Sequence, residues 1–273
     1  MTTMDWNIAR YRRGGEPEQV LDSIVLEFPL EIIVNGAPLV SLMRLPGMER
    51  ELALGFCLTE RIIDSVAQVR RLEQGGGRPA ADGPGEDGGL DRASRVHLDL
   101  EAPRERERFS PTDVVRTGSG AADLSAIDDD HAGEIRSELR VAAEVIYGIR
   151  EELTRRQDIF RGTGGTHGAG IFSAAGEVQT VAEDVGRHNA LDKTVGCCAL
   201  RGIALEDKIL ALSGRISYEM ALKTIRARLP VIVSMAAPTS LGLRIAQAAG
   251  LTVVGFSDAK RFNVYTHGRR ITP

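Results

Sequence analysis

Polar side chains are concentrated in residues 183–193, EDVGRHNALDK, where only three of eleven residues are aliphatic. Arg187 and His188 can bind the oxygens of a phosphate-bearing ligand, with Asp184 or Asp192 orienting them. The same side chains can instead form an internal network that fixes the chain beside a sheet. His188 can also act as a general base, or simply hydrogen-bond Asp184 or a carbonyl. The segment therefore predicts a pocket wall, with the internal network as the open alternative.

Three further loops follow apolar segments that are typical of buried strands. These loops are SGRIS (213–217), PTS (238–240) and SDAKR (257–261). Ser217 and Ser240 are predicted helix N-caps, and a helix N-terminus offers free N–H groups to an anion. Capping alone is an equally good explanation of both serines. Arg215 and Arg261 can each hold a phosphate through two parallel hydrogen bonds.

A glycine-rich stretch, RGTGGTHGAG at residues 161–170, adds backbone N–H groups that can approach a ligand closely. It matches neither a Walker A loop nor a dinucleotide-binding fingerprint. Because the carboxyl ends of strands are where open α/β sheets bind ligands, these loops together predict a site for a nucleotide-sized, phosphate-bearing molecule.

Metal chemistry has little support in the sequence. The five histidines and three cysteines include no Cys-x-x-Cys pair and no His-x-x-x-His pair, so no zinc site is predicted. The zinc deaminase signature is absent too, because His167 is followed by Gly-Ala and His188 by Asn-Ala. We therefore predict no metal.

Composition narrows the class of protein. The 273 residues are 42% hydrophobic and 26% charged, enough for one large or two modest globular domains. No stretch approaches the ~20 apolar residues of a membrane helix, and no secretory apolar segment follows the first charges. Cys57, Cys197 and Cys198 are odd in number, which favours a reducing cytoplasm. The net charge of -4 argues against a nucleic-acid partner.

The elements that position these residues follow from local patterns. LEIIVNGAPLVSLM predicts two strands around an Asn35-Gly36 turn. Residues 48–64 predict a helix that buries Cys57, and residues 74–91 predict a mobile surface loop. A long helix is expected to present one apolar face. Its apolar positions are Ile135, Leu139, Ala142, Ile146, Ile149 and Leu153.

Strand and helix patterns alternate from residue 168 to the end of the chain, starting with a strand, turn and strand. A helix closed by Gly202 follows, then further strand and helix segments, and NVYT (263–266) is the last strand and a candidate edge strand. This alternation predicts an α/β fold with a largely parallel sheet covered on both faces.

Seven blocks, taken in order, resemble the FdhD family of formate dehydrogenase accessory proteins. The blocks are FPLEIIVNGAP, LMRLPGMERELALGFCLTERIID, GTGGTHGAGIF, EDVGRHNALDK, LSGRISYEM, SMAAPTSLG and GFSDAKRFNVYT. The resemblance implies a cytoplasmic homodimer that passes sulfur from a cysteine desulfurase to the bis-molybdopterin guanine dinucleotide cofactor of formate dehydrogenase or a related molybdoenzyme. It also implies a small α+β domain at 20–127 and a cytidine-deaminase-like three-layer α/β domain at 128–273.

In such proteins the glycine-rich loops and the loop resembling FSDAKR hold the guanine dinucleotide, so GDP-like nucleotides are expected ligands. The expected binding residues are Phe256, Ser257, Asp258, Ala259, Lys260, Arg261, Gly164, Gly165, His167, Arg187, His188, Ser213, Gly214 and Arg215. Arg187 and His188 would then face phosphate or pterin oxygens.

One segment departs from the family. The family carries sulfur on a Cys-x-x-Cys in a loop that corresponds to residues 116–127 here, RTGSGAADLSAI. Aligned without gaps, Ser119 and Ala122 stand where the cysteines are expected, and a serine hydroxyl cannot form or release a persulfide. Two hypotheses follow: a sulfurtransferase whose carrier cysteine is replaced at Ser119, or a chaperone that holds the cofactor without chemistry. An unrelated nucleotide-binding enzyme is a third.

Overall fold

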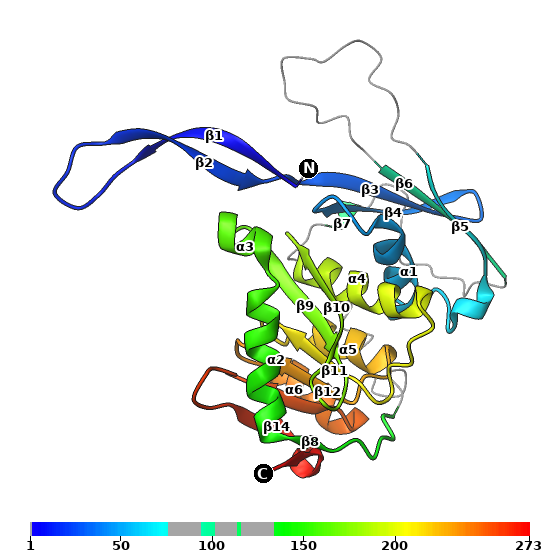
Figure 1. Ribbon diagram of the computed structural model, residues 1–273. Helices are drawn as coiled ribbons and strands as arrows, with labels where there is room; N and C mark the ends of the chain where they lie inside the picture. Colours follow the sequence, from blue (N-terminus) through cyan, green and yellow to red (C-terminus); the bar gives the residue numbers. More distant parts are fainter. Residues whose placement is uncertain (1, 76–93, 102–113, 116–133) are drawn as a thin grey trace.

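The computed structural model describes residues 2–75, 94–101, 114–115 and 134–273. Two larger sheets form the body of the molecule, and a two-stranded arm projects from it (Figure 1). Most of the predicted surface loop at 74–91 lies outside the described residues, as does all of 116–127 with Ser119. Gln74 and Gly75, which were expected in that loop, instead end a strand.

The first larger sheet has five strands in the order β5-β6-β3-β4-β7. They are β3 (Phe28–Val34), β4 (Ala37–Arg44), β5 (Val69–Gly75), β6 (Ser94–Leu100) and β7 (Val114–Val115). β3 and β4 form the predicted hairpin, with Asn35 at φ 49° and Gly36 at φ 81°. Helix α1 (Glu49–Thr59) packs on this sheet and buries Cys57, as the sequence predicted, and a short helix, η1 (Val66–Gln68), precedes β5.

The second larger sheet has six strands in the order β10-β9-β11-β12-β13-β14. They are β9 (His167–Phe172), β10 (Val178–Asp184), β11 (Ile209–Leu212), β12 (Val231–Ser234), β13 (Thr252–Gly255) and β14 (Asn263–Thr266). The expectation of a largely parallel sheet is wrong, because only β11, β12 and β13 run parallel to one another. The connection from β9 to β10 is a short turn at Gly176, and a short turn can join only antiparallel strands. β14 is an edge strand, as predicted.

Helices cover both faces of this sheet. Leu210, Leu212 and Ile232 point into a core shared with α4 (Arg187–Leu200), α5 (Tyr218–Arg226) and α6 (Ser240–Ala249). The alternate residues Ile209, Ala211 and Val231 point to the other face, where α2 (Ala143–Arg155) packs. Among the described residues, no helix combines the length and apolar character needed to cross a membrane.

The helix expected from Ile135 onward is shorter than its apolar spacing suggested. It begins at Ala143, while Val141–Ala142 forms β8 and pairs with β15 (Ile271–Thr272) near the end of the chain. The N–H of Ile135 donates to the carbonyl of Ala249, so a backbone bond to a distant segment replaces the first helical turns. The short helices α3 (Asp158–Thr163) and η4 (Gly268–Arg270) complete the described elements.

A close helix crossing joins the two larger sheets. A Cβ at Gly55 on α1 would lie 1.8 Å from the carbonyl oxygen of Asp192, and one at Gly196 on α4 would lie 1.9 Å from that of Glu51. Only glycine allows two backbones to approach this closely. Next to the crossing, the buried carboxylate of Asp192 accepts hydrogen bonds from Thr59 (2.7 Å) and Lys223 (2.7 Å). The crossing therefore fixes the α4 segment, including its N-terminal end.

Candidate functional site

The candidate site lies where β11 and β12 end and β9 begins. Ser213, directly after β11, donates its N–H to the carbonyl of Gly168 (3.0 Å) and accepts from the N–H of Gly168 through Oγ (2.9 Å). The last residue of β12, Ser234, donates from Oγ to the carbonyl of Gly214 (2.6 Å). These bonds hold the Ser213–Gly214 backbone against both neighbouring strands. Three segments far apart in the sequence therefore meet where these strands end, and we call this place the strand-edge site.

His167 and Arg187 face Gly214 at this edge. A Cβ built on Gly214 would lie 3.4 Å from Nδ1 of His167 and 3.6 Å from Cδ of Arg187, so the glycine leaves room between them. The Nε of Arg187 is shielded from solvent and has no hydrogen-bond partner among the described residues. Burial, followed by the nearby Arg187 cation, lowers the pKa of His167. A neutral imidazole therefore stands beside a permanent cation.

The loop after β13 forms the next wall. Phe256, at φ 50°, donates its N–H to the carbonyl of Ala236 (3.1 Å), and Ser257 donates its N–H to the carbonyl of Ser234 (3.0 Å). Ser257 is only 2% exposed, and its Oγ has no hydrogen-bond partner in the part of the chain that the structure describes. A buried hydroxyl without a partner costs free energy, so its position suggests a ligand that it can contact.

Asp258 shapes the outer part of the same loop. Its carboxylate accepts the N–H groups of Lys260 (2.7 Å) and Arg261 (2.9 Å), and these bonds lower its pKa. Ala259, Lys260 and Arg261 are exposed, and the Arg261 side chain is 78% exposed. The tip of the loop therefore presents two cations to solvent rather than to a closed pocket.

Two residues that the sequence argument did not single out support this edge. Ser234 bridges β12 to Gly214, and Arg150 on α2 adds a positive charge that favours ionised Asp258. The ring of Tyr147 on α2 also packs on Phe262, with centroids 5.2 Å apart. Ser234 could have been identified from the sequence, because a polar residue at the end of an apolar strand marks the strand end. Nothing local in the sequence marks Arg150, because its role depends on a loop about a hundred residues away.

The acids of residues 183–193 have structural partners, as the internal-network interpretation expects, while Arg187 of the same segment faces Gly214. Asp184 forms a buried ion pair with Lys193 (2.7 Å) and accepts the N–H of Leu45 (3.1 Å). Asp192 binds Thr59 and Lys223, as described above. Glu183 accepts the N–H groups of two residues in the first turn of α3, at 2.9 and 2.8 Å. The expectation that Asp184 or Asp192 orients Arg187 and His188 through hydrogen bonds is therefore wrong.

His188 follows Arg187 in α4 and does not suit proton abstraction. Burial, followed by the cation of Lys223, lowers the pKa of His188 to about 3. The imidazole is therefore neutral near pH 7 and a very weak base. His188 is the second residue of α4, and its low basicity argues against a role as a general base.

The remaining predicted residues are more dispersed. Gly164 ends α3 at φ 68°, and a Cβ at Gly165 would lie 2.7 Å from Val25, so Gly165 packs on the base of the arm. Arg215 is exposed, at the mouth of the β11 loop. Ser217 caps α5 as predicted. The prediction that Ser240 caps α6 is wrong, because the cap is Thr239, which accepts the N–H of Gly242.

Cys57 and Cys198 are not suitable sulfur carriers. Burial raises the pKa values of Cys57 and Cys198 to about 12, and Cys197 is half-buried on α4. A thiol with such a pKa is almost entirely protonated near neutral pH and is a poor nucleophile. Within the described residues, no cluster of three or more His, Cys, Asp or Glu side chains could hold a metal ion.

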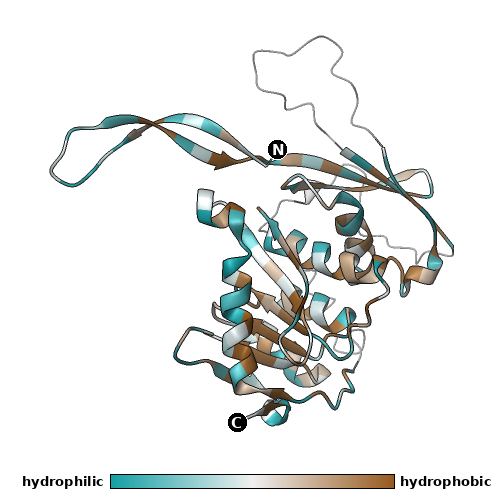
Figure 2. Ribbon diagram, in the orientation of Figure 1, coloured by the Kyte–Doolittle hydropathy of each residue, from teal (hydrophilic) through white to brown (hydrophobic). Residues whose placement is uncertain are grey.

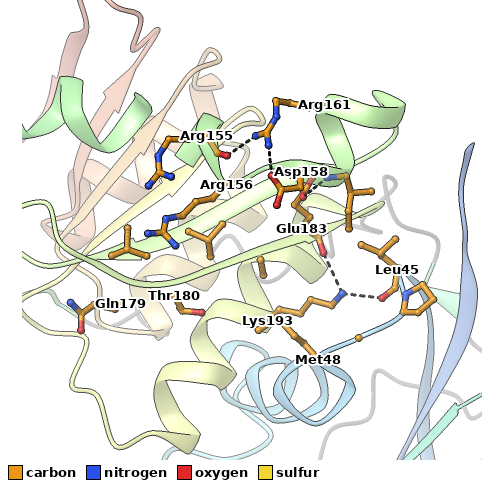
Figure 3. Close-up of a pocket in the computed structure, with 16 residues that line it drawn as sticks. Leu45, Met48, Arg155, Arg156, Asp158, Arg161, Gln179, Thr180, Glu183 and Lys193 are labelled. Carbon is orange, nitrogen blue, oxygen red and sulfur yellow. Dashed lines mark hydrogen bonds and ion pairs between the residues drawn. The ribbon is translucent and has the colours of Figure 1, made fainter. Parts of the chain in front are cut away.

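A separate open groove of about 830 Å³ lies beside α3 and β10 (Figure 3). Its walls come from the loop after β4, the end of α2, α3, β10 and Lys193 of α4. Glu183 and Lys193, the two ends of the segment predicted as a pocket wall, line this groove, but none of the expected binding residues does. Figure 3 shows Arg155, Arg156 and Arg161 on one side of the groove, while Lys193 is engaged with the carbonyls of Leu45 and Glu183.

The fold is that of an α/β protein with a mixed sheet, and buried polar atoms of Arg187 and Ser257 without partners among the described residues lie in the loops at the ends of its strands. Residues 25–272 match the model of the FdhD/NarQ family, and the chain belongs to that family.

Relatives cover nearly the whole chain. It is 36% identical over 267 residues to the sulfur carrier protein FdhD of Sulfolobus acidocaldarius, spanning 96% of this chain and 94% of that one. It is also 36% identical over 269 residues to the sulfur carrier protein FdhD of Anaeromyxobacter dehalogenans, spanning 95% and 91%. A crystal structure from Desulfotalea psychrophila, assigned as a formate dehydrogenase accessory protein, has the same fold. Its TM-score is 0.78 at 23% identity, with 100% of both chains covered.

Proposed function

We propose that this chain is an accessory protein of formate dehydrogenase maturation that binds the bis-molybdopterin guanine dinucleotide cofactor at the strand-edge site. In this function it takes part in passing sulfur from a cysteine desulfurase to the cofactor, which then enters formate dehydrogenase or a related molybdoenzyme. Membership of the FdhD/NarQ family and the names of the relatives support this function.

One observation carries the binding part of the proposal. The Oγ of Ser257 and the Nε of Arg187 are both buried, and neither has a hydrogen-bond partner among the described residues. A hydroxyl and a guanidinium N–H can both donate to phosphate oxygens, and a phosphate-bearing ligand that accepts from each of them would remove the cost of leaving them unpaired. The exposed cations of Arg215, Lys260 and Arg261 fit an anionic dinucleotide that approaches from solvent.

The architecture supports finer assignments as part of the same proposal. Residues 128–273 form a cytidine-deaminase-like three-layer domain without the deaminase zinc, and residues 20–127 form a smaller α+β domain. The six-stranded mixed sheet with helices on both faces supports the first assignment. The protein acts in the cytoplasm as a homodimer.

The sulfur step depends on Ser119. This position lies outside the described residues, and the family resemblance places the persulfide-bearing cysteine there. Since Cys57 and Cys198 are buried with strongly raised thiol pKa values, neither can substitute for that cysteine. With serine at 119 the chain has no thiol at the carrier position, so sulfur transfer through that position requires a cysteine at 119.

The absence of a thiol at position 119 favours a second candidate function. In it, the chain is a non-catalytic chaperone that binds the cofactor and delivers it to a molybdoenzyme. The two functions share the binding site and differ only in chemistry, so a thiol restored at 119 separates them.

Intact mass spectrometry tests the proposal. The parent and Ser119→Cys are incubated with a cysteine desulfurase and cysteine, and Ser125→Cys in the same loop serves as the matched control. We expect one reducible sulfur atom on Ser119→Cys and none on the parent or the control. Persulfide on the parent would contradict the placement of the carrier position. Its absence from all three forms, with guanine nucleotides still released from the purified protein, would select the chaperone.

A further inference from the structure

The groove beside α3 and β10 exposes the edge of a sheet. We call it the β10 groove, and its lining includes six consecutive residues of β10, 178–183. β10 comes first in the order of the six-stranded sheet, and among the described strands only β9 pairs with it. An uncovered strand edge carries backbone N–H and C=O groups that can pair with another chain. Strand β10 therefore offers a template for an added strand.

The strand pairing shows which backbone groups of β10 point to the open edge. Gly168 on β9 uses both its N–H and its C=O on Ser213, so neither is directed at Glu183, its paired residue on β10. In an antiparallel ladder, the N–H and C=O of such a residue both point away from the neighbouring strand. Glu183 therefore directs its own groups outward, and so does Val181, two residues earlier in the same register. The bond from Nζ of Lys193 to the carbonyl of Glu183 (3.3 Å) agrees with this direction.

One wall of the β10 groove is cationic. Arg155 and Arg156 at the end of α2 are exposed, and both pair with the single carboxylate of Glu152, at 2.7 and 2.6 Å. Arg161 on α3 is exposed too and pairs with Asp158. Three guanidinium groups therefore share two carboxylates, which leaves an excess of one positive charge in this set. A chain with a net charge of -4 thus presents a local cationic wall here (Figure 3).

Another wall is apolar. Leu45, Pro46 and Met48 line it, in the loop between β4 and α1. Figure 2 shows that the central strands β11 and β12 are strongly hydrophobic, whereas α2 beside the groove mixes hydrophilic and hydrophobic positions. Helix α3 also contacts β2 (Glu18–Val25), which pairs with β1 (Thr3–Arg10) to form the arm. An incoming strand would therefore meet guanidinium groups on one side and apolar side chains on another.

The length of the open edge favours an extended peptide chain as the occupant. Six strand residues at ~3.3 Å each extend for about 20 Å, several times the size of a phosphate group. A second copy of this chain is less suitable, because a two-fold contact between identical edges would bring the cationic wall of one copy against that of the other. Acidic side chains on a peptide complement this wall, and apolar side chains between them fit the apolar wall.

We propose that the β10 groove is a docking site for an extended, acidic segment of a partner protein, which adds as a strand beside β10. The added strand exchanges backbone hydrogen bonds with Val181 and Glu183, and its carboxylates pair with Arg155 and Arg156. This docking site is additional to the strand-edge site, because the groove includes none of the expected cofactor-binding residues. Either assignment can therefore fail without the other.

Amide hydrogen exchange tests the direction of the backbone groups. The probe is a heptapeptide that alternates valine and glutamate, added to the full chain. We expect exchange of the Val181 and Glu183 amides to slow at least about tenfold at saturation, because their N–H groups become bonded. The amides of Thr180 and Ala182 already point at β9 and should change less than about threefold. Equal slowing of all four amides, or of none, would overturn the proposal.

Fluorescence anisotropy of the labelled heptapeptide tests the chemistry of the groove. We expect a micromolar dissociation constant and at least about tenfold weaker binding of a valine–lysine heptapeptide. Methylation of every peptide nitrogen in the first peptide should cause the same loss, and excess GDP should leave its binding unchanged. Displacement by GDP or pyrophosphate would assign the groove to a small anion and contradict the proposal. So would sedimentation that shows the peptide releasing monomers from a dimer, because the edge would then belong to a second copy.

Charge-reversal variants identify the wall. Arg155→Glu and Arg156→Glu should each weaken binding of the valine–glutamate peptide about tenfold or more. Arg136→Glu is the matched control, because Arg136 is 84% exposed and does not line the groove. It should change the dissociation constant less than about threefold. Circular dichroism verifies that each variant is folded. Unchanged peptide binding in both groove variants would show that the cationic wall is not the docking surface.

Discussion

Replacing Ser257 with alanine should raise stability and lower ligand affinity at the same time. Its Oγ is buried without a partner among the described residues, so the folded protein without ligand bears an unsatisfied hydroxyl. Removing that hydroxyl deletes a desolvation cost and leaves the backbone bond from Ser257 to Ser234 intact. We expect Ser257→Ala to be unchanged or more stable by up to about 1 kcal/mol.

Affinity should move in the opposite direction. If the hydroxyl donates to a ligand phosphate, its loss costs about 1.5–3 kcal/mol, which is roughly a 10- to 150-fold increase in Kd. Calorimetric titration with GDP measures the affinity, and urea denaturation without ligand measures the stability. The opposite signs make the prediction specific, because a merely structural serine would lose stability when it is replaced.

Ser234→Ala is the matched control. The Oγ of Ser234 donates to the carbonyl of Gly214 (2.6 Å) and accepts the N–H of Ala236 (2.9 Å), so both of its partners are internal. Its loss should destabilise the protein by about 1–3 kcal/mol. The reasoning is refuted if Ser257→Ala is destabilised like the control, or if it binds GDP as tightly as the parent does.

Three further outcomes are expected. Arg187→Ala should weaken GDP binding by about 2–3 kcal/mol and Arg215→Ala by about 1 kcal/mol, because only the guanidinium of Arg187 is partly buried at the site. Calorimetry that finds the larger loss of affinity in Arg215→Ala would contradict this order. The folded-state pKa of His188 is about 3, below its ordinary 6.5, so stability is full above about pH 6.5 and falls by up to ~1.4 kcal/mol per unit as the pH drops toward 3. Urea denaturation at pH 4 and 7 should show His188→Gln to be less acid-sensitive than the parent, and equal sensitivity would remove His188 as the cause. Gly55→Ala should cost more than about 3 kcal/mol or prevent folding, since its Cβ would lie 1.8 Å from the backbone oxygen of Asp192; a thermal midpoint like that of the parent would argue against the close helix crossing.

Local sequence determined the elements whose signals are short-range. The Asn35-Gly36 hairpin follows from two residues that tolerate positive φ, and α1 and α4 follow from helical spacing and the glycine after the second helix. The resemblance to the family could also be recognised from the sequence, because seven blocks in the same order carry more information than any one motif. Ser213 and Ser257 were placed correctly at strand ends because a polar residue after an apolar run marks that position.

Tertiary structure decided which polar groups remain available to a ligand. Asp184 was expected beside Arg187, but its partners include the backbone of Leu45, which is 139 residues away. The helix expected from Ile135 lost its first turns to a bond with Ala249. Local patterns cannot specify such pairings, because a carboxylate or an N–H binds whichever partner the folded chain brings within about 3 Å. The unpartnered Oγ of Ser257 and the projecting arm could not be predicted from the sequence either, since both depend on which contacts the rest of the folded chain provides.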